Sequence, residues 1–551
     1  MNGAVMKKGS EIQGTIKKIL FPNKGIAYVD GVQVRIKNAI PGQKVSAVVK
    51  KKRGTHYEAQ LIEVLENSGF EDASERCAHA GSCGGCLYSG FRYSEELKIK
   101  EEQVRELLVP EMPEGKALPM LPIVGSPVRF GYRNKMEFSF GDEVKGGPLT
   151  LGLHKRGSFY DILTVDQCMI ADHDFNLILK AVLDYMTEAG IPFYKKMEKT
   201  GVLRHLLVRK TFYTKEILVD LVTTSSYKPD DSFAQMLLAL PLEGTLTGIL
   251  HTENDSPADV VADQGTEVLY GQPYITERLL GLEFKITPFS FFQTNSAGAE
   301  KLYSIMREFV GRTDGKVIYD LYSGTGTIAQ ILAPVAEKVI GVEIVPEAVE
   351  AARENTELNH LSNCEFICGD VLKVLDDLTA PPDILILDPP RDGIHPKALP
   401  KLLGYNADRI IYISCKPTSL KRDLPAFIEA GYDVEKMQCV DMFPGTGNVE
   451  TVCILSKLSE AKNHISVKVD MDELDLTAAE SKATYEEIQE WVKEKFGFHV
   501  THLNIAQVKR KHGIIERENY NKPKSPDSKQ PGCPEEKEKA VEAALKHFQM
   551  I

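Results

Sequence analysis

Short segments of alternating apolar and polar residues occupy most of the first 66 positions of the chain. They are separated by turns rich in Gly, Pro and Asn, and they cover Glu11–Leu20, Gly25–Val34, Lys44–Lys52 and Tyr57–Glu66. A period of two is typical of strands that bury one face. About five short strands in this length predict a small OB-like β-barrel, a fold that commonly binds nucleic acids.

The next part, residues 67–284, mixes a cysteine-rich loop, a helix and further alternating segments. The helical pattern runs over Ser94–Leu108, and the strand-like segments are Met136–Phe140, Leu149–Leu153, Leu203–Lys210 and Glu216–Thr223. We interpret these segments as antiparallel strands of a central α+β domain that carries the cysteine loop.

After Phe284 the pattern changes to short apolar strands that alternate with helical stretches. The strands are Val317–Leu321, Lys338–Val342, Cys364–Ile367, Ile384–Leu387 and Ile410–Ser414. Such alternation is typical of a doubly wound α/β domain, and it predicts a Rossmann-like fold over residues 285–458.

Residues 459–551 form a polar, partly helical extension. Helical patterns cover Tyr485–Phe496 and Lys537–Phe548, and a loop rich in Lys, Pro and Ser, Asn521–Glu535, lies between them. We expect that loop to be exposed and mobile. The predicted parts of the chain are therefore 1–66, 67–284, 285–458 and 459–551.

Composition indicates a globular protein of several domains and excludes a fibrous or mostly disordered one. The chain has 551 residues, of which 43% are hydrophobic and 26% are charged. It has no run of 18 apolar residues and no signal-peptide core at its start, so we expect a cytoplasmic protein that does not cross a membrane. Ten cysteines are too few for a disulfide scaffold, and clustered ones indicate metal binding or catalysis.

Charge is distributed unevenly along the chain. The formal net charge is −12, yet residues 1–66 hold 12 Lys and Arg against five Asp and Glu, a local charge of +7. Because salt screens charges beyond about 10 Å, this local excess decides the attraction to phosphates. A Lys-rich strand edge can also merely prevent aggregation, but the dense run Lys50–Arg53 favours RNA binding.

A glycine turn marks a candidate cofactor site. The strand Val317–Leu321 runs into a turn with Gly324 and Gly326, and the next strand ends at Glu343, about 20 residues later. Glycines allow a ligand to approach closely, and an acid at that distance can bind both ribose hydroxyls. The lack of a third glycine and a further acid after the following strand, Asp370, favour S-adenosylmethionine over a dinucleotide. A turn without a ligand is the alternative.

Two more strands end in residues with reactive side chains. Asp388 follows Ile384–Leu387, and Cys415 follows Ile410–Ser414 and precedes Lys416. Because Pro389 stops the first of these strands, we expect the Asp388 carboxylate to face the same crevice as the glycine turn. A thiol beside a cation at this crevice can ionise and attack an electrophile. A buried structural cysteine is the alternative.

Five motifs together indicate a resemblance to a known family. They are Phe292-Gln293-Thr294-Asn295, Asp320-Leu321-Tyr322-Ser323-Gly324-Thr325-Gly326, Leu387-Asp388-Pro389-Pro390-Arg391, Ser414-Cys415-Lys416-Pro417 and Asn448-Val449-Glu450-Thr451. In this order they resemble the S-adenosylmethionine-dependent RNA (uracil-5-)-methyltransferases. The most similar branch is the RlmD/RlmCD-like enzymes of 23S ribosomal RNA, which carry an N-terminal TRAM domain. The resemblance covers roughly residues 9–458.

The resemblance implies covalent catalysis. C5 of uracil is a poor nucleophile, so Cys415 would add to C6 and make C5 electron-rich before it accepts the methyl group. Glu450 would then remove the C5 proton, and the thiolate would leave. The cofactor-binding side chains that the resemblance implies are Gln293, Tyr322, Glu343 and, at the uracil edge or beside the methionine part of the cofactor, Asp388.

One segment departs from the family pattern. Several relatives carry histidines in the Met-Phe-Pro segment before the catalytic Glu, whereas Met442–Asn448 contains none here. Glu450 is retained, so we expect proton removal without a histidine from this segment.

A separate group of cysteines forms a candidate metal site: Cys77, Cys83, Cys86 and the distant Cys168. Four thiolates suit either zinc or an iron–sulfur cluster, and the spacing slightly favours zinc. The resemblance instead implies a [4Fe–4S] cluster with a structural role. A redox-sensing role and free structural cysteines are the alternatives. We interpret the remaining cysteines as core or incidental, namely Cys364, Cys368, Cys439, Cys453 and Cys533.

These observations predict a monomeric enzyme that methylates C5 of uridine in 23S ribosomal RNA. Around Phe130–Met136, interleaved aromatic and basic residues can stack a base and contact phosphates, or form a half-buried strand. The rival hypotheses are methylation of transfer RNA and a non-catalytic iron–sulfur RNA-binding or assembly factor. The tail beyond residue 460, with its basic stretch Lys509–His512, can dock on RNA or protein or be a solvated appendage.

Overall fold

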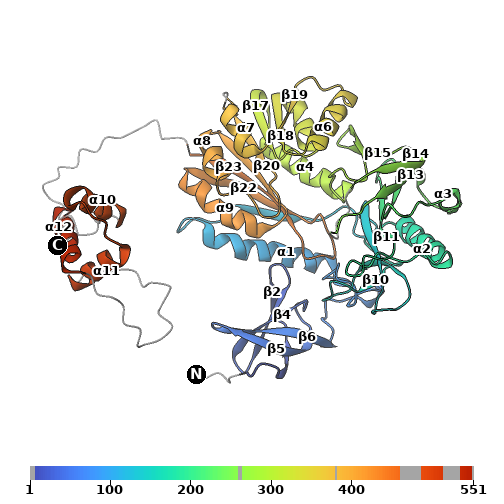
Figure 1. Cartoon of the computed structure of the whole chain (residues 1–551), viewed down its shortest axis with the longest axis horizontal. Coiled ribbons are helices and arrows are strands. Elements are labelled where there is room, and N and C mark those ends of the chain that lie inside the picture. The colour runs from blue at the N-terminus through green and yellow to red at the C-terminus, as the bar shows by residue number, and fades with distance from the viewer. Residues whose placement is uncertain (1–5, 258–262, 379–380, 459–484, 513–533, 549–551) are drawn as a thin grey trace. The chain divides into compact units, whose positions relative to one another are not determined.

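The computed structural model describes residues 6–257, 263–378, 381–458, 485–512 and 534–548 (Figure 1). The chain divides into two compact units, Met1–Glu460 and Ala461–Ile551. The described part of the first unit contains a six-stranded, a seven-stranded and an eight-stranded sheet and a two-stranded ribbon. The described part of the second unit is helical.

The first sheet is built from residues 11–66, and its strands lie in the order β1-β5-β6-β4-β3-β2. The strands are Glu11–Thr15 (β1), Lys18–Leu20 (β2), Lys24–Val29 (β3), Val32–Lys37 (β4), Lys44–Arg53 (β5) and His56–Glu66 (β6). Alternate residues of β4 and β5, among them Val34, Ile36, Val45 and Ala47, are buried in one core. The predicted alternation therefore reflects one buried face.

Two of the predicted strands in this sheet are each divided. Glu11–Leu20 breaks where the N–H groups of Ile16 and Lys17 donate to Gln43 and Ile26. Gly25–Val34 folds into a hairpin at Asp30-Gly31, whose φ angles are 49° and 76°. Asp-Gly favours this kind of turn because both positions need a positive φ. The pair therefore indicates the hairpin, whereas the alternation of apolar and polar residues does not.

The central sheet has the strand order β10-β9-β8-β11-β12-β13-β14. Its strands are Lys135–Gly141 (β8), Thr150–His154 (β9), Ile162–Thr164 (β10), Leu203–Lys210 (β11), Glu216–Thr223 (β12), Thr245–Glu253 (β13) and Thr266–Gly271 (β14), covered by α2 (His173–Glu188) and α3 (Asp231–Leu238). The predicted antiparallel pairing is confirmed for β8, β9, β11 and β12. The next strand pair, β12 and β13, was not part of that prediction. These two run parallel because α3 connects them as a crossover.

The third sheet confirms the predicted doubly wound α/β fold, with the strand order β19-β18-β17-β20-β21-β23-β22-β7. Its strands are Met120–Val124 (β7), Thr313–Leu321 (β17), Ala336–Glu343 (β18), Cys364–Cys368 (β19), Ile384–Leu387 (β20), Arg409–Ser414 (β21), Tyr432–Val440 (β22) and Glu450–Lys457 (β23). Strands β17 to β21 run parallel, and β23 is antiparallel to β21. The helices around the sheet are α1 (Tyr93–Leu108), α4 (Ser296–Val310), α5 (Thr327–Leu332), α6 (Pro346–Leu358), α7 (Val371–Asp377), α8 (Ala398–Gly404) and α9 (Pro417–Glu429). A ribbon of β15 (Ile275–Leu279) and β16 (Leu282–Ile286) precedes α4.

Alternate side chains of the inner strands enter two separate cores. On β20, Ile384 and Ile386 pack with α4, α5 and α6, whereas Leu385 and Leu387 pack with α1, α7, α8 and α9. This explains why these strands read as continuous apolar runs. The strand order reverses between β17 and β20, which opens a crevice at their carboxyl ends.

An upstream segment completes this sheet. β7 comes from residues 120–124, which the sequence placed in the central part, and it pairs in parallel with β22, where Met120 faces Met437. The preceding helix α1 packs beside α9 on the same sheet (Figure 1). The boundary between the second and third parts of the chain stays a prediction.

The second unit contains α10 (Tyr485–Phe496), α11 (His502–Lys511) and α12 (Glu535–His547) around a small apolar core. Two of these helices were predicted, and α11 was missed. In the basic stretch, Lys509 is only 5% exposed, Lys511 pairs with Glu538, and His512 pairs with Glu542 at 2.9 Å. Much of its charge is therefore used inside the unit. The predicted loop Asn521–Glu535 lies largely outside the described residues, as does Cys533.

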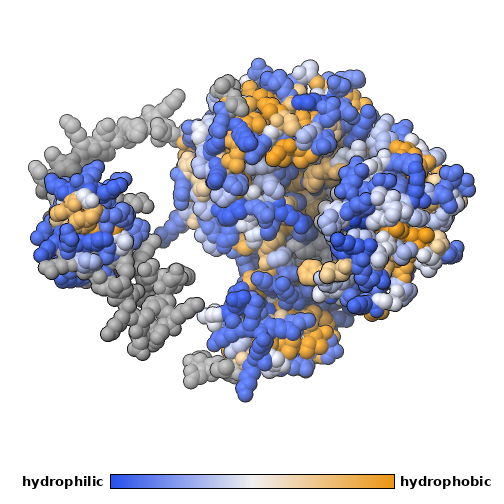
Figure 2. Space-filling model, viewed as in Figure 1, coloured by the Kyte–Doolittle hydropathy of each residue, from blue (hydrophilic) through white to orange (hydrophobic). Residues whose placement is uncertain are grey.

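The surface is mostly hydrophilic on the face that Figure 2 shows, with apolar residues in smaller patches. Among the described residues, every helix is too short or too polar to span a membrane.

Candidate active site

The glycine turn after β17 forms the base of the candidate cofactor site. Tyr322, Gly324 and Gly326 all have positive φ angles, of 68°, 54° and 74°. A Cβ on Gly326 would lie 2.6 Å from the Phe366 ring, so only glycine fits there. A Cβ on Gly324 would meet nothing closer than Phe291, at 4.0 Å. The turn therefore leaves open space where a ligand can approach the backbone.

Glu343, at the end of β18, faces this turn. Its carboxylate accepts backbone hydrogen bonds from Gly324 at 3.0 Å, Ile344 at 2.8 Å and Val345 at 2.9 Å. These bonds hold the acid beside the turn, where the sequence predicted ribose binding.

Asp370, the further acid that favoured S-adenosylmethionine over a dinucleotide, follows β19 and caps helix α7. Its carboxylate accepts a hydrogen bond from the N–H of Leu372 at 2.9 Å. Burial and the charge of Asp370 raise the pKa of Tyr322 to about 12. Asp370 therefore lies near the glycine turn, although helix capping already occupies one of its oxygens.

Gln293 lies where the central sheet meets the third sheet. The Asn134 amide donates to the Gln293 carbonyl and to Ser296 Oγ, both at 2.9 Å. The Gln293 side chain hydrogen-bonds to the hydroxyl of Tyr303 on α4, a residue that is 3% exposed. Burial, and next the charge of Asp388, raise the pKa of Tyr303. Tyr303 was not among the predicted site residues, because a tyrosine on the apolar face of a helix is typical of a core residue.

Two poorly solvated carboxylates lie at the carboxyl ends of β17 and β20. Asp320 is fully buried, and no side chain in the described part of the chain hydrogen-bonds to either of its carboxylate oxygens. Burial and Asp388 raise its pKa well above the usual range, which the nearby N–H of Ala329 offsets only in part. Burial also raises the pKa of Asp388 to about 7. Orphaned acceptors beside an open glycine turn fit a ligand rich in donors, such as S-adenosylmethionine.

The strand register brings the predicted nucleophile and base together. Ser414 of β21 pairs with Thr451 of β23, so the adjoining residues Cys415 and Glu450 lie side by side at the edge of the crevice. Glu450 is 3% exposed. Burial, and next the charge of Asp388, raise its pKa to about 8. A thiol and a carboxyl group at this place can act as nucleophile and proton acceptor on one ligand.

The expected activation of the thiol by Lys416 is wrong for the free protein. Burial and the charges of Glu450 and Asp388 raise the pKa of Cys415 to about 11. The cation that lowers this pKa is Arg391, whereas the Lys416 ammonium lies 3.9 Å from Asp392. Burial and two carboxylates outweigh one guanidinium, so the thiol stays protonated at neutral pH.

Arg391 is held by its backbone. Ser419 Oγ donates to the Arg391 carbonyl at 2.7 Å, and Asp423 accepts a hydrogen bond from the N–H of Ile394 at 3.0 Å. Both partners lie on α9, so this helix fixes the loop that follows Asp388. These contacts join segments about 30 residues apart and could not be predicted from a local motif.

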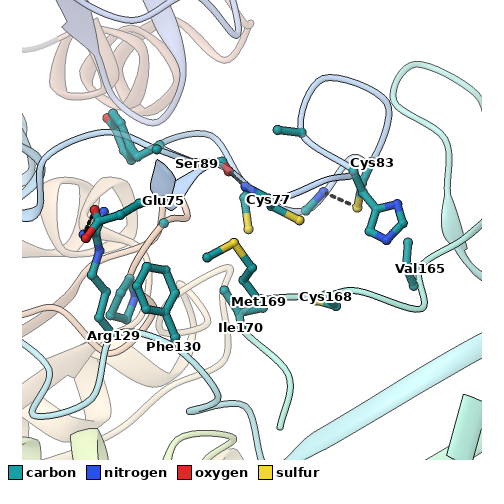
Figure 3. Close-up of a pocket in the computed structure, with 18 of the residues that line it drawn as sticks. Glu75, Cys77, Cys83, Ser89, Arg129, Phe130, Val165, Cys168, Met169 and Ile170 are labelled. Carbon is teal, nitrogen blue, oxygen red and sulfur yellow. Dashed lines mark hydrogen bonds and ion pairs between the residues drawn. The ribbon is translucent and has the colours of Figure 1, made fainter. Parts of the chain in front are cut away.

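The four cysteines predicted as metal ligands line one cavity of about 50 Å³. They are Cys77, Cys83, Cys86 and Cys168. Figure 3 shows Cys77 and Cys83 on the loop before α1 and Cys168 on the segment opposite. All are free thiols. The N–H of Gly85 donates to Cys83 Sγ at 3.4 Å, and those of Ile170 and Ala171 donate to Cys168.

The described residues form no metal site in this structure. No three His, Cys, Asp or Glu side chains among them are arranged to hold a metal ion. This finding supports neither the slight preference for zinc nor the iron–sulfur cluster that the resemblance implies. The four thiols nevertheless line one cavity, and N–H groups donate to two of their sulfurs.

The aromatic and basic segment at Phe130–Met136 is mostly internal. Tyr132 is 1% exposed, and its hydroxyl donates to the Pro444 carbonyl at 3.0 Å, so it cannot stack an RNA base. Phe130 is 38% exposed, and the Arg129 guanidinium lies 5.0 Å from its ring centroid. Of the two interpretations of this segment, RNA contact or partial burial, burial is therefore correct for Tyr132.

Two protein-family models match the chain. One, described as a methyltransferase domain, matches residues 312–452. The other, described as tRNA (Uracil-5-)-methyltransferase, matches residues 248–370. The two ranges include Gln293, the glycine turn, Asp388, Cys415 and Glu450.

Relatives match over most of their own length. An uncharacterized RNA methyltransferase of Clostridium tetani is 48% identical over 448 residues, which are 81% of this chain and 98% of that protein. One of Bacteroides thetaiotaomicron is 35% identical over 454 residues, 78% of this chain and 98% of that protein. The crystal structure of the tRNA (uracil-54, C5)-methyltransferase of Pyrococcus abyssi with S-adenosyl-L-homocysteine is 25% identical. It covers 81% of this chain and 100% of that chain, with a TM-score of 0.64.

Proposed function

Since the chain belongs to the RNA (uracil-5-)-methyltransferase family, we propose that it methylates C5 of a uridine in 23S ribosomal RNA. S-adenosylmethionine-dependent methylation of uracil C5 in RNA is the activity of the family. The observation that carries the proposal is the register of β21 and β23, which sets Cys415 beside Glu450.

Each of these two residues has one task in the reaction. Bound S-adenosylmethionine would supply an electrophilic methyl group, with S-adenosylhomocysteine as the leaving group. The Cys415 thiolate forms a bond to C6, and the C5=C6 electron pair makes C5 nucleophilic, so that C5 accepts the methyl group. The Glu450 carboxylate then takes the C5 proton. The C5–H electron pair restores the double bond, and the C6–S bond breaks to return the thiolate.

The charges around these residues determine when they act. With pKa values of about 11 and about 8, Cys415 and Glu450 are mainly protonated in the free protein at neutral pH. Arg391 lowers both pKa values and so favours the reactive forms. We assign cofactor binding to Gln293, Tyr322, Gly324, Gly326, Glu343, Asp370 and Asp388.

Ribosomal RNA is favoured by two features outside the active site. Residues 11–66 form a sheet within the basic first part of the chain, as in a TRAM domain, and the cysteines Cys77, Cys83, Cys86 and Cys168 line one cavity. We propose that these cysteines hold a [4Fe–4S] cluster, as in the RlmD-like branch. Iron and sulfide analysis of anaerobically purified protein tests this part. We also propose that the enzyme acts as a monomer in the cytoplasm, which gel filtration and cell fractionation test.

Transfer RNA is the second candidate, because one matching family model and the Pyrococcus abyssi structure name it. Incubation with labelled cofactor and unmodified 23S ribosomal RNA or transfer RNA separates the candidates. We expect label on a 23S uridine, and none with Cys415→Ala. Label on transfer RNA alone would refute the ribosomal substrate. No label on either RNA would favour a non-catalytic RNA-binding factor.

A further inference from the structure

The loop that leads to Glu450 is held through its main chain. It joins β22 to β23 and spans residues 441–449. The Gly445 carbonyl accepts hydrogen bonds from the N–H groups of Leu87 and Tyr88, both at 2.8 Å. Partners more than 350 positions away in the sequence therefore fix the path of the chain into Glu450.

The same loop is part of the wall of the cysteine cavity. Pro444 and Gly445 line the cavity together with the cysteines, and a Cβ on Gly445 would lie 3.8 Å from Cys86 Sγ. Leu87 follows Cys86 directly, so the backbone beside one of the thiols donates to Gly445. The Tyr132 hydroxyl holds the neighbouring Pro444 carbonyl at 3.0 Å. The cysteine site and the loop are thus in direct contact.

A buried ion cluster fixes the other side of the loop. Lys100 of α1 is fully buried and donates to Glu96 and Asp441, both at 2.7 Å, and to the Phe443 carbonyl at 3.3 Å. Glu96 also accepts a hydrogen bond from the N–H of Gly445 at 2.7 Å. A buried ion cluster resists displacement, because losing one partner leaves an uncompensated charge. The ion cluster thus holds the loop as far as the Gly445 N–H, so a shift of the cysteine loop acts on the Gly445 carbonyl and on the residues after it.

We propose that the cysteine loop positions the catalytic base, with the Cys86-Leu87 backbone holding Gly445 and Gly445 setting the place of Glu450. Tyr132 is a positioning residue on the same path. The inference rests on the proposed function, in which Glu450 takes the C5 proton after methyl transfer. Cys415 follows β21 and lies outside this loop. A disturbed cysteine site should therefore slow elimination more than it slows formation of the Cys415–C6 bond.

The test compares full-length Tyr132→Phe and Cys86→Ser with the wild type and Glu450→Gln, on an RNA fragment that carries the mapped uridine. Rapid quenching gives two quantities, the fraction of enzyme in a denaturant-stable adduct with RNA and the rate of product release. We expect Glu450→Gln to accumulate adduct and to lose about 10²- to 10⁴-fold in product rate. Tyr132→Phe removes one buried hydrogen bond, so its product rate should fall by up to about tenfold while adduct accumulates.

Cys86→Ser should accumulate at least as much adduct as Tyr132→Phe. The matched control is Tyr432→Phe, which loses a buried hydrogen bond of 2.8 Å to the Ala407 carbonyl away from the loop and should change neither quantity. The inference is overturned if adduct and product fall in parallel, or if neither changes, in Tyr132→Phe. If Cys86→Ser does not fold, the result for the conservative variant Tyr132→Phe alone tests the inference. If Glu450→Gln accumulates no adduct at Cys415, the proposed function fails and the inference falls with it.

Discussion

The charge of Asp388 raises the pKa of Glu450, although the two carboxylates lie at the ends of different strands, β20 and β23. Burial is the larger cause, and Arg391 acts in the opposite direction. The result, a pKa of about 8, leaves the base mostly protonated at neutral pH in the free protein. Elimination should therefore accelerate as the pH rises through about 8.

Asp388→Asn should move this pH dependence to lower pH. Removing the negative charge lowers the pKa of Glu450, so the base ionises earlier in an alkaline titration. The measurement is the rate of adduct breakdown against pH, at saturating cofactor because Asp388 is also proposed to bind it. Asp392→Asn is the matched control, since its side chain is 98% exposed in the same loop. An unchanged midpoint in Asp388→Asn would contradict the coupling.

Glu450→Gln should stabilise the fold at alkaline pH. A carboxyl group whose pKa rises from 4.5 to about 8 on folding costs no stability below pH 4.5 and costs progressively more as the pH rises towards 8. The variant should gain up to about 5 kcal/mol in unfolding free energy at pH 8.5 and little at pH 5. Denaturant unfolding at both pH values measures the gain. An equal gain in unfolding free energy at both pH values would indicate an effect of packing and not of Glu450 ionisation.

The two glycines of the cofactor turn should respond differently to alanine. In Gly326→Ala the new Cβ would lie 2.6 Å from Phe366 and 2.9 Å from Ala352, so the free energy of unfolding should fall by about 1–3 kcal/mol. In Gly324→Ala the Cβ enters open space, so stability should fall by only about 1 kcal/mol while cofactor affinity drops. Calorimetric unfolding and titration with S-adenosylhomocysteine measure both effects. Similar affinity of Gly324→Ala and wild type would place the cofactor elsewhere.

Tyr303→Phe should weaken cofactor binding about two- to tenfold. The hydroxyl bonds to Gln293, and losing one buried hydrogen bond costs about 0.5–1.5 kcal/mol. Equilibrium titration with S-adenosylhomocysteine measures the dissociation constant. Tyr432→Phe again serves as the control for a lost buried hydroxyl. Equal affinity in Tyr303→Phe and wild type would refute a role for Tyr303 in holding Gln293.

Local patterns predicted those parts of the fold that depend on neighbours in sequence. The strands Leu203–Lys210 and Glu216–Thr223 coincide with β11 and β12, because both are short segments rich in apolar residues that end at turns. The glycine turn and the strand that ends just before Cys415 were also predicted, because in each case the functional residues lie within one short motif. Helix α11 was missed because it buries few apolar residues, such as Ile505 and Val508, within a charged segment.

Features that depend on distant contacts could not be predicted. The pairing of β7 with β22 joins segments more than 300 residues apart, and a five-residue strand carries no sign of its partner. The cation near Cys415 was expected to be its sequence neighbour Lys416, but the fold supplies Arg391 from another loop. The pKa of the thiol depends on burial, which a motif does not record.

The ion cluster of Lys100 also constrains how the protein is made. Asp441 is synthesised 341 residues after Lys100, so the ammonium group must stay hydrated while the ribosome translates most of the chain. Until Asp441 emerges, Glu96 on the same helix is the carboxylate that pairs with Lys100, so α1 cannot complete its buried ion cluster. A chain released before that point lacks one of the two carboxylate partners of Lys100, and we expect its α1 to be more accessible to proteases. The loop at residues 441–449 is therefore completed only near the end of synthesis of the first unit.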